Sequence, residues 1–98
     1  MRIEVSGRHL DLTPSMTEYA EQKAGKLPRY YDGVQEIDVI LEQQREEFFV
    51  ELRVDVEKHD TFVAKQNSHD IYKGIDGAID KMTRQLTDFK EKLKNSKH

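Results

Sequence analysis

The sequence predicts an α+β fold, a two-layer sandwich in which a four-stranded mixed sheet carries two helices on one face. The first observation is the alternation of apolar and polar residues, typical of strands with one buried face, in four segments: residues 2–6, 36–42, 48–56 and 61–66. The second is the recurrence of apolar residues every three or four positions, as in amphipathic helices, in two segments: residues 14–27 and 70–94. The third is their order along the chain, β-α-β-β-β-α, which leaves two helices to cover one apolar sheet face.

The first helix is predicted to start at Thr13 and Pro14, and Pro28 either stops it or lies just past its end. Threonine can cap the free N–H groups of the first turn, and proline at the first helical position loses no hydrogen bond. The apolar face of this helix has residues at steps of four and three: Met16, Ala20, Ala24 and Leu27. Because the helix joins the first two strands, these can be parallel through a right-handed crossover, and the later short turns imply antiparallel pairs.

The strands after the first helix have one apolar and one charged face. The residues expected to point inward are Ile37, Val39, Leu41, Phe48, Val50, Leu52, Val54 and Val56, and in the last strand Phe62 and Ala64. The outward face is expected to be acidic, with Glu36, Asp38, Glu42, Glu51 and Asp55. Turns are expected at residues 43–47, which contain no glycine, and at His59-Asp60. An acidic face repels phosphate, so a nucleic acid would have to bind through the helices.

The last helix has the longest apolar stripe, which consists of Tyr72, Ile75, Ile79, Met82, Leu86, Phe89 and Leu93. Packing on the sheet is the favoured explanation of this stripe, and a coiled-coil seam is the alternative. Asp70 is a candidate cap, and the lysines between Lys90 and Lys97 suit the negative end of the helix dipole. Gly74 and Gly77 weaken a helix, which indicates close packing or the close approach of a partner there.

Composition limits the functions that the chain can have. With 98 residues it is expected to be one domain, residues 1–98, and without cysteine it has no disulfide or thiolate chemistry. The four histidines, including His98, show no metal-ligand spacing, and no nucleophile or phosphate-loop motif is present. We therefore expect no enzyme, no cofactor and no metal site. No segment resembles a signal peptide or a membrane span, so we expect a cytoplasmic protein without a membrane partner or a small-molecule substrate.

Charge is distributed unevenly along the chain. The net charge is −3 overall, but it is −7 in residues 32–60, +1 in residues 1–31 and +3 in residues 71–98. The candidate RNA-binding residues are the basic side chains of the two helices and of the exit from the first: Lys23, Lys26, Arg29, Lys81, Arg84, Lys90, Lys92 and Lys94. Tyr30 and Tyr31 follow Arg29, and aromatic rings can stack on unpaired bases. A solvated helix face would explain any one of these lysines. The lysines that the first helix adds, the tyrosines next to Arg29 and, most of all, the acidic outer face of the sheet favour binding to phosphates through the helices.

The last helix resembles that of the bacterial ribosome hibernation factors, whose pattern is D-x-Y-x-x-I-D-x-x-I-D-K-x-x-R-Q-L followed by lysines. The matching residues are Asp70, Tyr72, Ile75, Asp76, Ile79, Asp80, Lys81, Arg84, Gln85 and Leu86. The first helix and its exit at Tyr30-Tyr31-Asp32 are similar to the other half of the family pattern. The chain departs from the family at Asp88, where lysine is common, and this carboxylate weakens the positive field locally.

The resemblance implies a fold similar in outline to double-stranded-RNA-binding domains. It also implies binding to the small ribosomal subunit and its rRNA, in the channel of mRNA and of the A- and P-site tRNAs, which blocks translation in stationary phase or stress. The chain length is similar to that of the short hibernation promoting factors, which act with a ribosome modulation factor to pair ribosomes into inactive dimers.

A second hypothesis is that the chain is a protein-interaction module. It would use the long helix or an open sheet edge and would not bind RNA, and its lysines would be solvated. Salt dependence separates the two hypotheses, because each phosphate contact makes binding weaker as salt rises, whereas apolar contacts do not.

Overall fold

The structure, a computed structural model, describes residues 1–95; Lys97 and His98 lie outside the described residues. The elements in chain order are β1 (Arg2–Arg8), α1 (Pro14–Ala24), the 3-10 helix η1 (Leu27–Arg29), β2 (Val34–Gln44), β3 (Glu47–Val56), β4 (Phe62–Ser68) and α2 (Ile71–Asn95). Every strand and helix that the sequence predicts is therefore present, and η1 is an addition.

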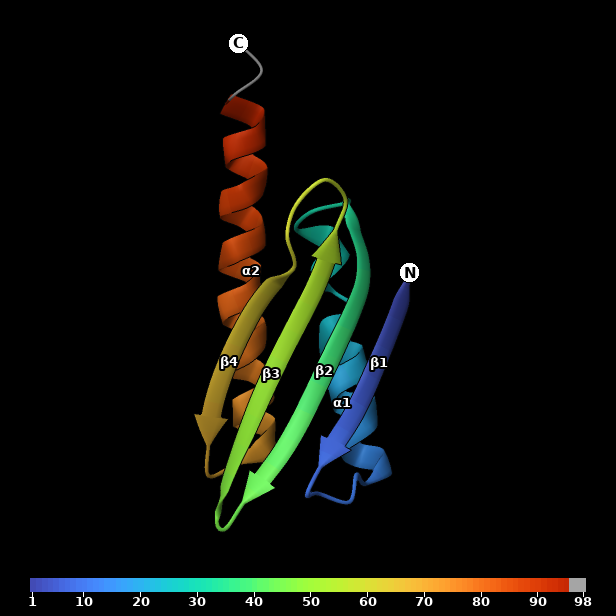
Figure 1. Ribbon diagram of the computed structural model, residues 1–98, viewed down its shortest axis with the longest axis vertical. Helices are drawn as coiled ribbons and strands as arrows, with labels where there is room; N and C mark the ends of the chain where they lie inside the picture. The colour runs from blue at the N-terminus through green and yellow to red at the C-terminus, as the bar shows by residue number, and fades with distance from the viewer. Residues whose placement is uncertain (96–98) are drawn as a thin grey trace.

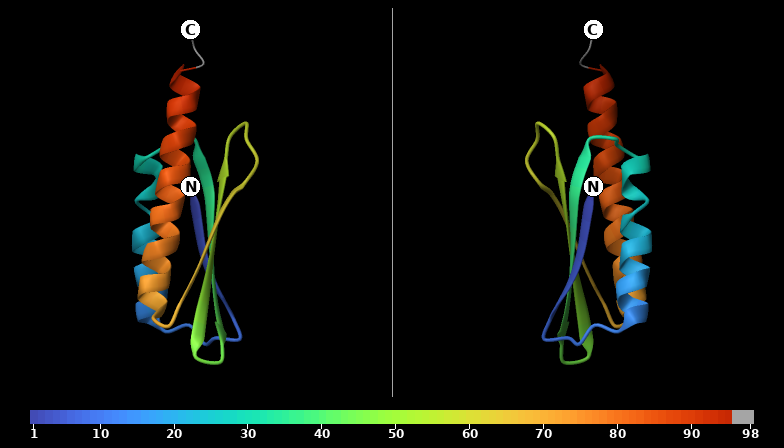
Figure 2. Two further views of the ribbon diagram at one scale, coloured as in Figure 1. Left: turned by 90° about the vertical axis from the view of Figure 1, so that its left-hand side faces the viewer. Right: turned by 90° about the vertical axis from the view of Figure 1, so that its right-hand side faces the viewer.

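The four strands form one sheet in the order β1-β2-β3-β4 (Figure 1). Strand β1 is parallel to β2, whereas the β2–β3 and β3–β4 pairs are antiparallel. Seen along the edge of the sheet, α1 and α2 lie on the same face (Figure 2). The predicted two-layer sandwich with a mixed sheet is confirmed, and the second face of the sheet is left to solvent.

The core lies between the sheet and the two helices. The inward residues of β2 and β3 are buried as predicted, except Phe48, which is half-buried, and in β4 Ala64 is buried and Phe62 half-buried. Every layer contributes large side chains that are less than 2% exposed: Leu27, Ile37, Leu41, Val50, Leu52, Val54, Ile75, Met82 and Leu86. The stripe of α2 thus packs on the sheet, and the coiled-coil alternative is not needed to explain it.

Helix α1 begins as predicted but ends earlier. The Thr13 side chain accepts a hydrogen bond of 3.2 Å from the backbone N–H of Met16, which is the expected N-terminal cap. The helix ends at Ala24 instead of continuing to Leu27, because Gly25 is a poor helix former and Pro28 cannot donate to a preceding carbonyl. The chain forms η1 instead, and Leu27 remains fully buried.

Helix α2 approaches the sheet closely at its N-terminal end. The Asp70 carboxylate accepts hydrogen bonds from the N–H groups of Tyr72 and Lys73, as a cap does. A side chain at Gly74 would place its Cβ 3.1 Å from a methyl group of Val50, and at Gly77 it would lie 2.7 Å from Cγ of Gln66. The two glycines therefore allow α2 to pack closely on β3 and β4. Of the two explanations that the sequence suggests, close packing and the approach of a partner, the structure supports the first.

Helix α2 is longer than the strands that it covers. Its 25 residues extend for about 37 Å, whereas the seven residues of β4 span about 23 Å. The C-terminal turns consequently project beyond the sheet (Figure 1), and the molecule measures 51 × 22 × 18 Å along its principal axes. Leu93, the last residue of the apolar stripe, is 38% exposed.

Candidate nucleic-acid interface

A polar bridge joins α1 to the first half of α2. The Tyr19 hydroxyl donates a hydrogen bond of 2.6 Å to Oδ1 of Asp76, and Nζ of Lys23 lies 3.9 Å from the same oxygen. The hydrogen bond to Asp76, with burial and the nearby negative charge, raises the pKa of Tyr19 to about 12. The Tyr19 ring also packs edge-on against Tyr72 at 5.1 Å between ring centroids. Lys23 therefore shares its charge with Asp76, which lowers its attraction for a phosphate.

A groove lies between the exit of η1 and the last turns of α2. We call it the basic groove; it is lined by Arg29, Tyr30, Thr87, Lys90, Glu91 and Lys94. Lys90 and Lys94 are one helical turn apart, so their side chains project from the same flank of α2 toward η1. Three cations against one carboxylate give the groove a positive potential that attracts anions. Tyr30 is 41% exposed, so its ring is available to stack on a base.

The structure separates the two tyrosines that are adjacent in the sequence. Tyr31 is only 9% exposed, and its ring packs edge-on against Phe89 at 5.3 Å between centroids. Burial raises the pKa of Tyr31, with smaller contributions from Glu57 and Asp32. The expectation that Tyr31 stacks on bases is therefore wrong, because the chain turns into the core at this residue to enter β2.

Two polar side chains on the opposite flank of α2 tie the helix to β4. Nζ of Lys81 donates a hydrogen bond of 2.7 Å to the carbonyl oxygen of Lys65, and Nε2 of Gln85 donates one of 3.0 Å to that of Val63. Lys81 is exposed and retains further N–H donors, so it can serve the fold and still face a ligand.

The remaining candidate cations are spread around the helices. Lys26 and Arg84 are exposed, Lys26 just before η1 and Arg84 on the solvent side of α2. Lys92 lies on the β4 flank of α2, in a separate hollow with His59 and Phe62. Of the eight predicted residues, the structure brings Arg29, Lys90 and Lys94 into one groove. Thr87 and Glu91, which also line this groove, were missed, although their helical spacing from Lys90 and Lys94 could have indicated them.

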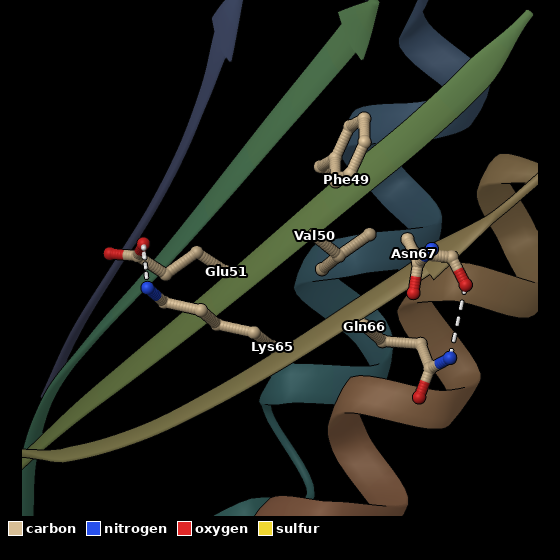
Figure 3. A pocket seen from close by; sticks show the side chains of 6 residues that line it. All are labelled: Phe49, Val50, Glu51, Lys65, Gln66 and Asn67. Atoms are coloured by element: carbon tan, nitrogen blue, oxygen red, sulfur yellow. Dashed lines mark hydrogen bonds and ion pairs between the residues drawn. The ribbon is translucent and has the colours of Figure 1, made fainter.

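The outer face of the sheet has a different character. The predicted acidic residues lie there, and Glu51 has Arg53 at 3.2 Å and Lys65 at 3.9 Å. A shallow hollow between β3 and β4 is lined by Phe49, Val50, Glu51, Lys65, Gln66 and Asn67 (Figure 3). Since the lysine of this hollow is paired with Glu51, the hollow does not attract phosphate as the basic groove does.

Other kinds of site find no support in the part of the chain that the structure describes. Within residues 1–95, no group of three or more histidine, aspartate or glutamate side chains could hold a metal ion. Nor is any helix in that range long and apolar enough to cross a membrane. His59 and His69 lie in turns, where Nδ1 of each contacts a backbone carbonyl oxygen, of Asp60 at 2.8 Å and of Glu46 at 3.3 Å.

Comparison with known proteins identifies the family. Residues 3–94 match the family described as "Sigma 54 modulation protein / S30EA ribosomal protein". The chain belongs to this family. Three similar members are each named ribosome hibernation promoting factor. The protein of Klebsiella oxytoca is 30% identical over 94 residues, covering 96% of this chain and 98% of its own. That of Escherichia coli (strain K12) is 31% identical with the same coverage, and that of Azotobacter vinelandii is 33% identical over 92 residues, covering 94% and 85%.

Solved structures of similar proteins agree with the fold. A ribosomal subunit interface protein from Coxiella burnetii superimposes with a TM-score of 0.81 at 28% identity, covering 93% of this chain and 99% of that one. The N-terminal domain of Protein Y from Thermus thermophilus gives the same TM-score and identity, covering 91% and 99%. The family resemblance drawn from the last helix is therefore confirmed.

Proposed function

We propose that this protein binds the small ribosomal subunit in the channel used by mRNA and by the A- and P-site tRNAs, and that it blocks translation there. Family membership supports a role on the ribosome, as do relatives whose names refer to ribosome hibernation and to a subunit interface. Such a factor works in the cytoplasm, under stress or in stationary phase. It performs no chemical reaction, since inhibition follows from occupying a site that tRNA needs.

The observation that carries the proposal is the contrast between the two faces of the molecule. The helix side has the basic groove, with Arg29, Lys90 and Lys94 around an exposed Tyr30. The open sheet face has paired cations and an excess of carboxylates. RNA phosphates are therefore attracted to the helices and repelled by the sheet, which fixes the orientation of the bound protein.

We propose that all eight helix-side cations contact rRNA phosphates, with the basic groove at the centre: Lys23, Lys26, Arg29, Lys81, Arg84, Lys90, Lys92 and Lys94. Phosphate contacts add affinity but carry no sequence information, so specificity comes from the fit to a preformed rRNA surface. A ribosome modulation factor is a further partner in the proposed pairing of inactive ribosomes, and sucrose-gradient sedimentation with and without that factor tests this step.

The main experiment is co-sedimentation with purified small ribosomal subunits over a series of salt concentrations. Replacement of two groove cations, Lys90→Glu with Lys94→Glu, should weaken binding at least about tenfold and reduce the log–log salt slope by about 1.4–1.8. The matched control is Arg8→Glu with Lys73→Glu, which makes the same charge change at the other end of the molecule, at the end of β1 and the start of α2 (Figure 1).

Two outcomes would contradict the proposal. Equal loss of binding in the groove variant and in its control would show that only net charge matters. No binding to subunits at low salt would favour the protein-interaction hypothesis, in which the lysines are merely solvated. Binding that competes with initiator tRNA would support the proposed location in the channel.

A further inference from the structure

A second hollow lies on the other flank of α2, opposite the basic groove. We call it the aromatic hollow; it is lined by His59, Phe62, Gln85, Asp88, Phe89 and Lys92. The residues come from the β3–β4 turn, from the start of β4 and from the second half of α2. Its volume is about 390 Å³, which lies within the range of small-molecule sites.

Three rings form one wall of the aromatic hollow. The imidazole of His59 is stacked on Phe62, with 4.5 Å between centroids and 10° between planes, and its centroid lies 4.6 Å from that of Phe89. The two phenylalanine centroids are 5.3 Å apart, so the three centroids form a nearly equilateral triangle. Phe62 therefore covers one face of the imidazole, and the Phe89 ring lies at a tilt beside both. His59 is exposed, so part of its imidazole is accessible to a further flat ring.

The imidazole and one amide of the hollow are held in place by the backbone. Nδ1 of His59 lies 2.8 Å from the carbonyl oxygen of Asp60, which fixes the plane of the ring. Nε2 of Gln85 donates to the carbonyl oxygen of Val63, which fixes the amide and leaves its oxygen as an acceptor. A ring that enters the hollow thus meets an imidazole and an amide that each already have a backbone partner, which lowers the entropy cost of binding.

The other polar groups of the hollow suit the two ends of a nucleotide. Lys92 offers a cation to a phosphate, and Asp88 offers two carboxylate oxygens that accept hydrogen bonds. A cation beside a stacking surface is the usual arrangement for binding single-stranded nucleic acid. The carboxylate adds a preference among bases.

We propose that the aromatic hollow binds one unpaired guanine nucleotide of an RNA strand, with the base stacked on His59 and its N1–H and N2–H groups donating to Asp88. Guanine is the base whose Watson–Crick edge presents two adjacent donors, which match the two oxygens of a carboxylate. Adenine and cytosine present one amino group beside a ring-nitrogen acceptor, and uracil presents one N–H between two carbonyls, so each would place an acceptor against Asp88. The inference rests on the proposed function in taking RNA as the partner.

The test uses the isolated, isotope-labelled protein and four trinucleotides, 5′-UGU, 5′-UAU, 5′-UCU and 5′-UUU, titrated by NMR. We expect UGU to bind several-fold more tightly than the others and to shift the ring resonances of His59 and Phe62. His59→Ala should weaken UGU binding about tenfold, within the range found for the loss of one base stack, and His59→Trp should retain it. Asp88→Asn should remove the preference for guanine, whereas Asp80→Asn, the same change on the solvent side of α2, should not.

The proposal is overturned if the four trinucleotides bind equally, if the shifts fall on the basic groove instead, or if His59→Ala leaves UGU affinity unchanged. These results do not depend on the ribosome, so a failure here leaves the co-sedimentation result intact. Conversely, a selective UGU complex that persists in the Lys90→Glu with Lys94→Glu variant would support the aromatic hollow even if subunit binding failed.

Discussion

The bridge between α1 and α2 can be tested by removing one oxygen atom, with the substitution Tyr19→Phe. The hydroxyl of Tyr19 donates the 2.6 Å hydrogen bond to Asp76, while the ring packs against Tyr72. Phenylalanine keeps the ring and its packing, so the variant isolates the hydrogen bond. We expect the free energy of unfolding at pH 7 to fall by about 1 kcal/mol.

The magnitude follows from the pKa of Tyr19. A rise of the Tyr19 pKa from the ordinary value of 10.0 to about 12 is equivalent to roughly 2.7 kcal/mol in full. Because Tyr19 and Asp76 are both only half-buried, solvent screening reduces this figure, and about 1 kcal/mol is the amount expected to remain. This agrees with the usual net contribution of a hydrogen bond to stability, about 0.5–1.5 kcal/mol.

The contribution should also depend on pH with a definite sign. The folded-state pKa is raised, so the unfolded chain loses the Tyr19 proton first as pH rises. The stabilisation is complete below pH 10 and is lost between pH 10 and about pH 12. The two proteins are identical at every other position, so the informative quantity is the difference in unfolding free energy between wild type and variant.

The assay is urea unfolding of wild type and Tyr19→Phe at pH 7 and pH 11, followed by circular dichroism. We expect the difference in unfolding free energy to be clearly smaller at pH 11 than at pH 7, because the unfolded chain loses the Tyr19 proton before the folded protein does. Asp76→Asn serves as the second arm of a double-mutant cycle, in which the two substitutions together should cost less than the sum of their separate effects. A difference below about 0.3 kcal/mol at pH 7, or one that is unchanged at pH 11, would refute the reasoning.

Three further variants test the core, a cap and the RNA-binding surface. Leu86→Ala removes a side chain that is 0% exposed and should lower the unfolding free energy by about 2–5 kcal/mol in urea titrations. Thr13→Ala removes the cap of α1 and should cost about 1 kcal/mol by the same assay, with Thr13→Ser as a near-neutral control. Lys81→Glu with Arg84→Glu should abolish co-sedimentation with small subunits at physiological salt and leave the circular dichroism spectrum unchanged. Unaltered subunit binding by this folded variant would remove the middle of α2 from the proposed interface.

The elements could be predicted from sequence because their periodicity is long and uninterrupted. The alternation in β2 and β3 and the stripe of α2 each identify the buried face correctly. The most buried line of α2 residues, however, differs from the centre of the predicted stripe. Ile71 and Ala78, which the stripe omits, are 4% and 0% exposed, whereas Tyr72 and Ile79, which it includes, are half-buried. Periodicity defines an apolar stripe on a helix, but the position of the sheet decides which side of that stripe is most buried.

The grouping of side chains in the candidate site could be predicted less well. Arg29 meets Lys90 and Lys94 because α2 passes the exit of η1, and no spacing within either segment contains that information. The early end of α1 also depends on the low helix propensity of Gly25 and on Pro28 rather than on the apolar pattern, which continues to Leu27. The positive charge of the helices could be predicted from the sequence. Which cations line one groove and which lie apart from it could not.

The aromatic hollow could not be predicted from the sequence, for a similar reason. His59, Phe62 and Phe89 come from a turn, a strand and a helix, and the β3–β4 register together with the packing of α2 on β4 brings them together. The sequence assigned His59 to a turn, which is correct, but a turn residue has no periodic neighbours from which a ring stack could be inferred.

The length of α2 beyond the sheet implies a gradient of amide hydrogen exchange along one helix. Residues 71–89 belong to a segment packed on β3 and β4, so their amides exchange through openings that also disrupt the core. The last turns project past the sheet, and a helix end opens at a free-energy cost close to zero. Lys90 and Lys94 therefore stand where exchange changes from slow to fast. RNA bound in the basic groove would hold these turns in helical form. Slower amide exchange at residues 90–95, measured for each residue, would therefore indicate that the groove is occupied.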